Sequence, residues 1–304
     1  MTWQSALINL IKLLVCVAAF AAGLALGGML AAALNLPAPP LPAGLDPNAA
    51  GLAMLLESPL WVLVLIGLSR FITGPFAARA LMLAWFTWVA NAVNNQIEAS
   101  FFGSMAGGFW FTTVTFLGPS LLVAAAVAWL FGPPANRPGL IATARSFFGR
   151  HAAAGWLWRF GLAAVLFMPI YYVFGLLVIP FTIDFYRQGL FGLQIPPLPQ
   201  LLAILFVRSV LFFLACLPIV VAWQRSRRSQ ALSLGLALFF FVGFQPLIIA
   251  NWMPGRLRLP HLLEILADEF VYAWALAMLL GVKQALRPEA GQPSPRPALI
   301  SPKA

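Results

Sequence analysis

Polar residues recur at helical spacing inside an otherwise apolar stretch of this chain, WVANAVNNQIEASFF. Asn91, Asn94, Asn95 and Glu98 lie three and four positions apart, which places them on one face of a helix. Amide and carboxyl groups find no hydrogen-bond partners in lipid, so this face must point at other helices or at a wet cavity. The pattern predicts a binding surface or a polar packing contact within a membrane.

A second polar face lies in the last apolar stretch. His261, Glu264 and Asp268 fall at positions i, i+3 and i+7, and Glu269 lies on the adjacent face. Glu57, in an earlier apolar stretch, can join the same group. Carboxylates beside histidine or beside one another can carry acid–base chemistry, bind cations or transfer protons.

One basic residue is placed where it can pair with these carboxylates. Arg208 lies near the middle of the apolar stretch LLAILFVRSVLFFL, where an arginine costs about 3 kcal/mol on insertion scales unless it pairs or meets water. Glu98, Glu264, Asp268 and Glu269 are its expected partners, and Gln245 can add a hydrogen bond. The candidate residues for binding a substrate or ion are therefore Asn91, Asn94, Asn95, Glu98, Arg208, Gln245, His261, Glu264, Asp268 and Glu269. We assign no catalytic residue.

The composition indicates that these residues belong to a membrane protein. The 304 residues are 62% hydrophobic and 9% charged, whereas a soluble protein carries about 25% charged residues. We predict an all-α integral membrane protein, a polytopic bundle of about eight transmembrane helices in a single domain over 1–285. The spans are expected near 6–34, 51–69, 76–101, 108–131, 156–182, 197–222, 230–250 and 262–284, followed by a disordered cytoplasmic tail over 286–304.

The placement of basic residues predicts the orientation. With the N-terminus inside, thirteen Lys and Arg residues fall on the cytoplasmic side and three on the external side, as the positive-inside rule expects. Both termini are then cytoplasmic, and the plasma (inner) membrane of a bacterium is the expected location. The net charge of +10 indicates contact with the bilayer and with anionic lipid at the cytoplasmic face, and no nucleic acid is expected. Two groups of four spans would permit a parallel repeat, although the halves share no convincing residue similarity.

Smaller signals refine this organisation. Segment 139–155 is too short and too basic to span, so it is either a short helix at the cytoplasmic surface or an ordinary basic loop. Gly23 and Gly27 form a GxxxG pattern that suits close helix packing. Prolines inside the expected spans should kink them and free backbone carbonyls, at Pro119, Pro169, Pro218 and Pro246.

Motifs of known enzymes are mostly absent from the sequence. It has two histidines on opposite predicted sides and no HExxH, Walker or GxGxxG pattern, so we expect no cofactor and no metal. Three functions remain, in this order. The first is a small transporter or permease with an outward-facing polar site around Arg208 for a small polar molecule or cation. The second is an intramembrane enzyme acting on a lipid or lipid-linked substrate from the external side, and the third is a structural or assembly subunit. The oligomeric state stays open.

Overall fold

The computed structural model describes residues 3–42, 44–103, 108–132 and 139–281. Within these residues the chain is a bundle of helices, and its one β contact is an isolated antiparallel bridge between Ile72 and Trp223. The expected tail over 286–304 lies outside the described residues.

Seven helical stretches are long and apolar enough to cross a membrane, so the chain is a polytopic helical membrane protein. They are α1 (Trp3–Ala33), α2 (Pro47–Ser69), α3 through α4 (Phe76–Phe102), α5 (Phe109–Leu130), α7 through α8 (Ala153–Arg187), α9 (Leu198–Ala222) and α10 through α11 (Arg227–Ile249). The eighth predicted span corresponds to α12 (Gly255–Leu280), which is not among the seven. The described residues therefore support the class of fold with seven candidate spans, where the sequence predicted about eight.

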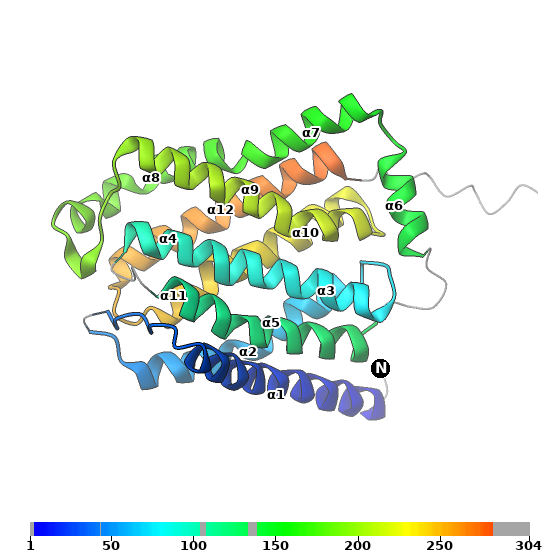
Figure 1. Cartoon of the computed structure of the whole chain (residues 1–304), viewed down its shortest axis with the longest axis horizontal. Coiled ribbons are helices and arrows are strands. Elements are labelled where there is room, and N and C mark those ends of the chain that lie inside the picture. Colours follow the sequence, from blue (N-terminus) through cyan, green and yellow to red (C-terminus); the bar gives the residue numbers. More distant parts are fainter. Residues whose placement is uncertain (1–2, 43, 104–107, 133–138, 282–304) are drawn as a thin grey trace, which may run out of the picture.

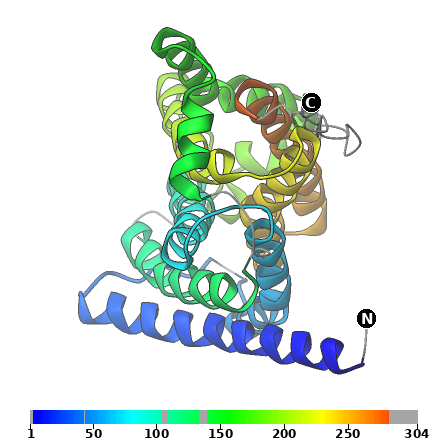
Figure 2. The same cartoon turned by 90° about the vertical axis from the view of Figure 1, so that its right-hand side faces the viewer.

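The helices fall into two groups that follow the same order. One group contains α1 to α5 and the other α7 to α12, and Figure 2 shows them as separate clusters. The third long helix of each group is interrupted by a π-helical segment. In the first group α3 (Phe76–Thr87) passes through η1 (Trp88–Val93) into α4 (Asn94–Phe102). In the second group α10 (Arg227–Leu238) passes through η3 (Phe239–Phe244) into α11 (Gln245–Ile249).

Two short connections, called the crossing links below, meet between the groups. One joins α2 to α3 and the other joins α9 to α10. The backbone N–H of Thr73 donates to the Ala222 carbonyl at 3.0 Å, and the backbone N–H of Gln224 donates to the Phe71 carbonyl at 2.8 Å. The bridge between Ile72 and Trp223 lies between these two bonds. The contacts are reciprocal, because each link gives the other one donor and one acceptor.

Arginine side chains gather at the end of the bundle that holds these links, called the basic end below. Arg150 donates to the carbonyls of Leu280 and Gly281, and Arg227 donates to Gly281, so guanidinium groups satisfy the last carbonyls of α12. Helix α6 (Leu140–Phe148) lies at this end (Figure 1). Segment 139–155 therefore contains a helix, and its Phe147 is buried.

The opposite end, called the far end, joins the two groups through other links. The Asn251 side chain exchanges hydrogen bonds with the Asp46 backbone, and the backbone N–H of Gln194 donates to the Phe102 carbonyl at 3.0 Å. The short helix η2 (Leu190–Gly192) belongs to this end.

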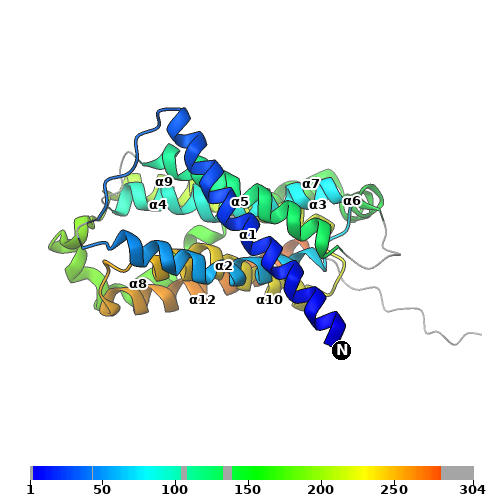
Figure 3. The same ribbon diagram turned by 90° about the horizontal axis from the view of Figure 1, so that it is seen from below.

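Helix α1 lies on the outside of the bundle and crosses α5 obliquely (Figure 3). A methyl group added at Gly23 would overlap the backbone of Pro119, and one at Gly27 would overlap the Thr115 carbonyl. The packing role predicted for the GxxxG pattern is confirmed, since the two helices approach to a distance that only glycine permits.

Prolines free carbonyls that side chains then satisfy. Pro218 has no N–H for the Leu214 carbonyl one turn earlier, and the Trp85 indole N–H donates to that carbonyl at 2.8 Å. The predicted kink at Pro169 corresponds to the break at Leu166, where α7 (Ala153–Val165) ends and α8 (Phe167–Arg187) begins.

Candidate functional site

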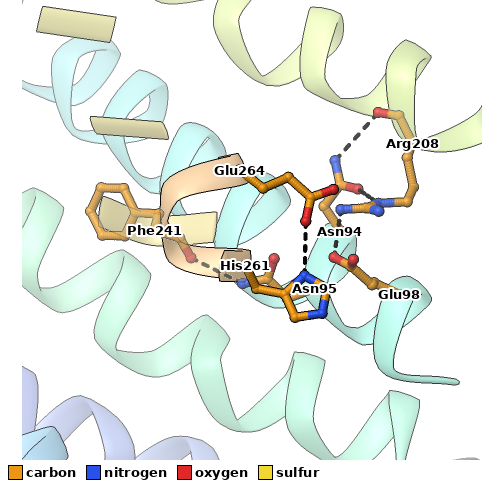
Figure 4. Close-up of polar contacts among 7 residues, drawn as sticks. All are labelled: Asn94, Asn95, Glu98, Arg208, Phe241, His261 and Glu264. Carbon is orange, nitrogen blue, oxygen red and sulfur yellow. Dashed lines mark hydrogen bonds and ion pairs between the residues drawn. The ribbon is translucent and has the colours of Figure 1, made fainter. Parts of the chain in front are cut away.

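Arg208 forms the centre of the predicted polar group. Its side chain is 1% exposed, and its Nη2 lies 2.7 Å from Glu98 Oε2 (Figure 4). Its Nε donates to Asn94 Oδ1 at 2.9 Å, and the Asn94 amide returns a bond to the Arg208 carbonyl. Of the four carboxylates expected as partners, Glu98 is the one that pairs with Arg208 within 4.0 Å in the described structure.

Aromatic rings complete the surroundings of the guanidinium. The rings of Phe167, Tyr171 and Phe212 lie 5.9, 5.6 and 5.8 Å from Arg208 Cζ. Ring faces attract a cation most strongly where water is excluded. Helices α8 and α9 of the second group supply these rings, whereas Asn94 and Glu98 belong to the first group. Arg208 is therefore enclosed by both helix groups and cannot reach lipid.

Three carboxylates of α12 are buried behind this ion pair. Glu264, Asp268 and Glu269 are 6%, 1% and 0% exposed. Asp268 Oδ1, both Glu269 oxygens and Arg208 Nη1 have no hydrogen-bond partner within the described part of the chain. Asp268 and Glu269 interact with Arg208 electrostatically at longer range. The guanidinium and these two acids therefore each hold unused hydrogen-bonding capacity.

Glu264 has a different partner. Its Oε2 lies 2.8 Å from His261 Nδ1, and the Nε2 of that histidine lies 3.2 Å from the Tyr186 hydroxyl. Glu264 was one of four candidate partners of Arg208, and it pairs instead with a donor one turn earlier in its own helix. Tyr186 did not figure among the sequence candidates, since it is a single aromatic residue near the end of α8 and belongs to no polar pattern.

The asparagines of η1 and α4 satisfy a backbone carbonyl of η3. The amides of Asn91 and Asn95 donate to the Phe241 carbonyl at 2.8 and 2.9 Å, and Asn91 also donates to Gln245 Oε1 at 2.7 Å. In a π-helical turn the Phe241 carbonyl would accept from residue 246, which is a proline without an N–H. Asn91 and Asn95 thus have a packing role whatever else they do.

The structure contains a cavity of about 400 Å³, and half of the predicted residues line it. Asn91, Asn95, Glu98, Gln245 and His261 line it, whereas Asn94, Arg208, Glu264, Asp268 and Glu269 are not part of its lining. The cavity extends from the π segments to the far-end links at Leu45 and Trp252. Glu98 belongs to the wall and to the ion pair, and its side chain stays 32% exposed.

Glu57 is buried in α2 and lies apart from the Arg208 group. It is 4% exposed and faces the side chain of Gln245. Neither of its oxygens, nor Gln245 Nε2, meets the distance and angle of a hydrogen bond to any described residue. Glu57 therefore approaches the cavity wall from behind Gln245.

These features define a polytopic helical membrane protein with a mainly apolar cavity that carries several polar residues, one of which belongs to a buried ion pair. In the described residues no group of three His, Cys, Asp or Glu side chains could hold a metal ion. No family model, curated protein or solved structure matches the chain.

Proposed function

We propose that this chain is a small transporter or permease that binds a small polar molecule or cation in the cavity from the external side. The observation that carries the proposal is the double position of Glu98, which lies on the cavity wall and pairs with the buried Arg208 at 2.7 Å. An ionisable pair inside a membrane that also meets a cavity is typical of substrate and ion pathways.

The ion pair between Glu98 and Arg208 can open when a cation replaces Arg208 at the Glu98 carboxylate. A cation that enters the cavity competes with Arg208 for the Glu98 carboxylate. Arg208 then turns its unpartnered Nη1 toward Asp268 and Glu269, whose free oxygens lie within electrostatic range. Occupancy of the cavity is thereby coupled to the contact between α9 and α12, which gives two arrangements of one network.

The basic end supports the predicted orientation of the chain. If the arginines there face the cytoplasm, the cavity lies in the external half of the membrane. Helix α12 then counts as the eighth span, because its carboxylates are buried against protein and do not meet lipid. The proposal includes the plasma membrane of a bacterium as the location.

Uptake into vesicles tests this function. The purified protein is reconstituted, and the uptake of labelled amines, amino acids, sugars and monovalent cations is measured for each solute separately. We expect uptake of at least one solute, and a loss of tenfold or more in Glu98→Gln. The matched control is Asp184→Asn, which removes the same charge from an exposed position of α8 outside the cavity lining. Unchanged uptake in both Glu98→Gln and Arg208→Ala would contradict the assignment of the site.

A second candidate, an intramembrane enzyme acting on a lipid or lipid-linked substrate, is favoured by the His261 contacts. With Glu264 ionised, His261 Nδ1 donates to it and Nε2 accepts from the Tyr186 hydroxyl, the arrangement of an oriented general base. His261 and Tyr186 both line the cavity. Mass spectrometry of lipids incubated with the protein should then detect a product that His261→Ala abolishes. If wild-type protein forms no product, this candidate is rejected.

A further inference from the structure

The two helix groups correspond position by position. Ile72 and Trp223, which pair in the crossing links, are 151 positions apart, the difference between 72 and 223. The same shift carries Trp88 onto Phe239, the first residues of the two π segments. Crossing links with reciprocal hydrogen bonds are what a two-fold relation between the groups requires, with its axis between the links.

Side-chain contacts obey the same shift. Arg208 in the second group binds Asn94 in the first, and the equivalent residues, Glu57 and Gln245, face each other with the groups exchanged. At the basic end, Arg79 Nη1 donates to Ser69 Oγ, and the equivalent Gln230 donates to the Val220 carbonyl. The correspondence therefore extends from the backbone to the buried polar residues.

The cavity lies on the axis of this relation. Residues at equivalent positions line it from both sides, as the pairs Asn91 and Val242, Asn95 and Pro246, Gln96 and Leu247, and Glu98 and Ile249. One wall thus comes from η1 and α4, and the other from η3 and α11. A ligand between them touches the same positions of both groups.

The two walls have different chemistry. The first wall offers hydrogen-bond acceptors. Asn95 Oδ1 and Gln96 Oε1 are buried without a partner in the described residues, and the Glu98 carboxylate is partly exposed. The orientation of the Asn95 amide is determined by its Nδ2, which donates to a carbonyl, so its oxygen is the free atom.

The second wall offers no such group at the equivalent positions, where Val242, Pro246, Leu247 and Ile249 stand. None of the described residues that line the cavity is a lysine or an arginine. The first wall therefore requires a donor or a cation. The second wall offers apolar surface at these four positions, while its Gln245 accepts from Asn91 and faces Glu57.

Resting on the transport function proposed above, we propose that the ligand is an amphipathic organic cation. Its ammonium group donates to Asn95, Gln96 and Glu98, and its short apolar body packs against Val242, Leu247 and Ile249. A volume of about 400 Å³ suits a small molecule, since ligand pockets begin at about 300 Å³.

Binding of n-alkylammonium ions to the full chain in lipid nanodiscs tests the proposal. Ethyl-, butyl- and hexylammonium are the probes, and hexanol and hexanoate are matched molecules without the positive charge. We expect affinity to rise about fourfold for each added methylene group, from the usual value of burying one. Hexylammonium should bind at least tenfold more tightly than hexanol, and hexanoate should not bind.

Variants assign each property to its wall. Glu98→Gln should lower the affinity for hexylammonium tenfold or more and leave hexanol unchanged. Ile249→Asn, or Leu247→Ala where that variant does not fold, should flatten the dependence on chain length and retain the preference for charge. Ile248→Ala is the control for the second wall, because Ile248 is 41% exposed and does not line the cavity.

Two results would overturn the proposal. The first is equal binding of hexylammonium and hexanol together with no effect of Glu98→Gln, and the second is a phospholipid acyl chain that hexylammonium cannot displace from the cavity. If alkylammonium ions do not bind while another solute shows Glu98-dependent uptake, the inference fails and the proposed transport function stands. If no solute shows such uptake, both fail.

Discussion

The two halves of this protein share a backbone arrangement and differ in the chemistry at equivalent positions. Glu57 and Arg208 occupy corresponding turns of α2 and α9, and both are buried. Arg208 is held by an ion pair, an amide and three aromatic rings, whereas Glu57 faces Gln245 without a hydrogen bond among the described residues. The framework of the protein is therefore symmetric, whereas the site is not.

A physical reason underlies this division. The framework rests on backbone groups, such as the crossing links and the Phe241 carbonyl that receives the amides of Asn91 and Asn95. Backbone groups are present whatever the side chain, so equivalent positions can keep their contacts while their side chains differ. The site rests on one buried ion pair, between Arg208 and Glu98, and its partners are needed in one place only.

The largest effect is expected from replacing the two equivalent buried ionisable residues, Arg208 and Glu57, in turn. Arg208→Met leaves Glu98, Asp268 and Glu269 without their cation. We expect a loss of about 3 to 5 kcal/mol in the free energy of unfolding, the usual cost of breaking a buried pair. Glu57→Gln should change it little or stabilise the fold, because the Glu57 carboxyl forms no hydrogen bond among the described residues that the variant would remove. Thermal unfolding in detergent, followed by tryptophan fluorescence, measures both.

Adding Glu98→Gln to Arg208→Met should recover part of the loss, since one unpaired charge is removed. Equal losses for Arg208→Met and Glu57→Gln would contradict the asymmetry. If Arg208→Ala abolishes folding while Glu98→Gln leaves uptake intact, the group serves only to lock the helices together, as a structural subunit would require.

The first helices of the two halves differ in how they attach. Helix α1 depends on glycine contacts with α5, whereas α8 packs with aromatic rings such as Phe167 against Tyr272. Gly27→Leu should therefore lower the free energy of unfolding by about 1 to 3 kcal/mol through overlap with the Thr115 backbone. Gly28→Leu is the control, because a methyl group there meets nothing within 4 Å. Equal effects of the two variants would show that α1 does not need the close approach.

The equivalent positions Asn95 and Pro246 can be tested as a pair. Asn95→Leu removes a donor from the Phe241 carbonyl and should cost about 1 kcal/mol. In a Pro246→Ala background the new N–H can serve the same carbonyl, so the cost should fall by about half. A double-mutant cycle in detergent measures the coupling, and strict additivity would contradict the shared carbonyl.

The smallest expected effect concerns Trp85, whose equivalent in the second half is Leu236. Trp85→Phe leaves the Leu214 carbonyl without its donor and should cost about 0.6 kcal/mol, the mean for a hydrogen bond between membrane helices. Trp129→Phe is the control, as Trp129 is 72% exposed. In a Pro218→Ala background, which restores the helix N–H, the effect of Trp85→Phe should disappear.

Local sequence patterns predicted much of this protein. Apolar stretches of sufficient length predicted the helical membrane fold, and glycine spacing in α1 predicted its packing against another helix. Spacings of three and four positions also placed the asparagines with Glu98, and His261 with Glu264, on common helix faces. These are properties of residues within one or two turns of each other, and helix geometry alone sets them.

Only the tertiary structure decided which faces meet. It selected Glu98 as the partner of Arg208, added Tyr186 to His261, and divided the candidate residues between a cavity wall and the protein behind it. These contacts join residues far apart in the chain, such as Asn91 and Gln245, 154 positions apart. Their formation depends on the register between helices, and the correspondence of the two halves is carried by backbone geometry that a comparison of residue types does not detect.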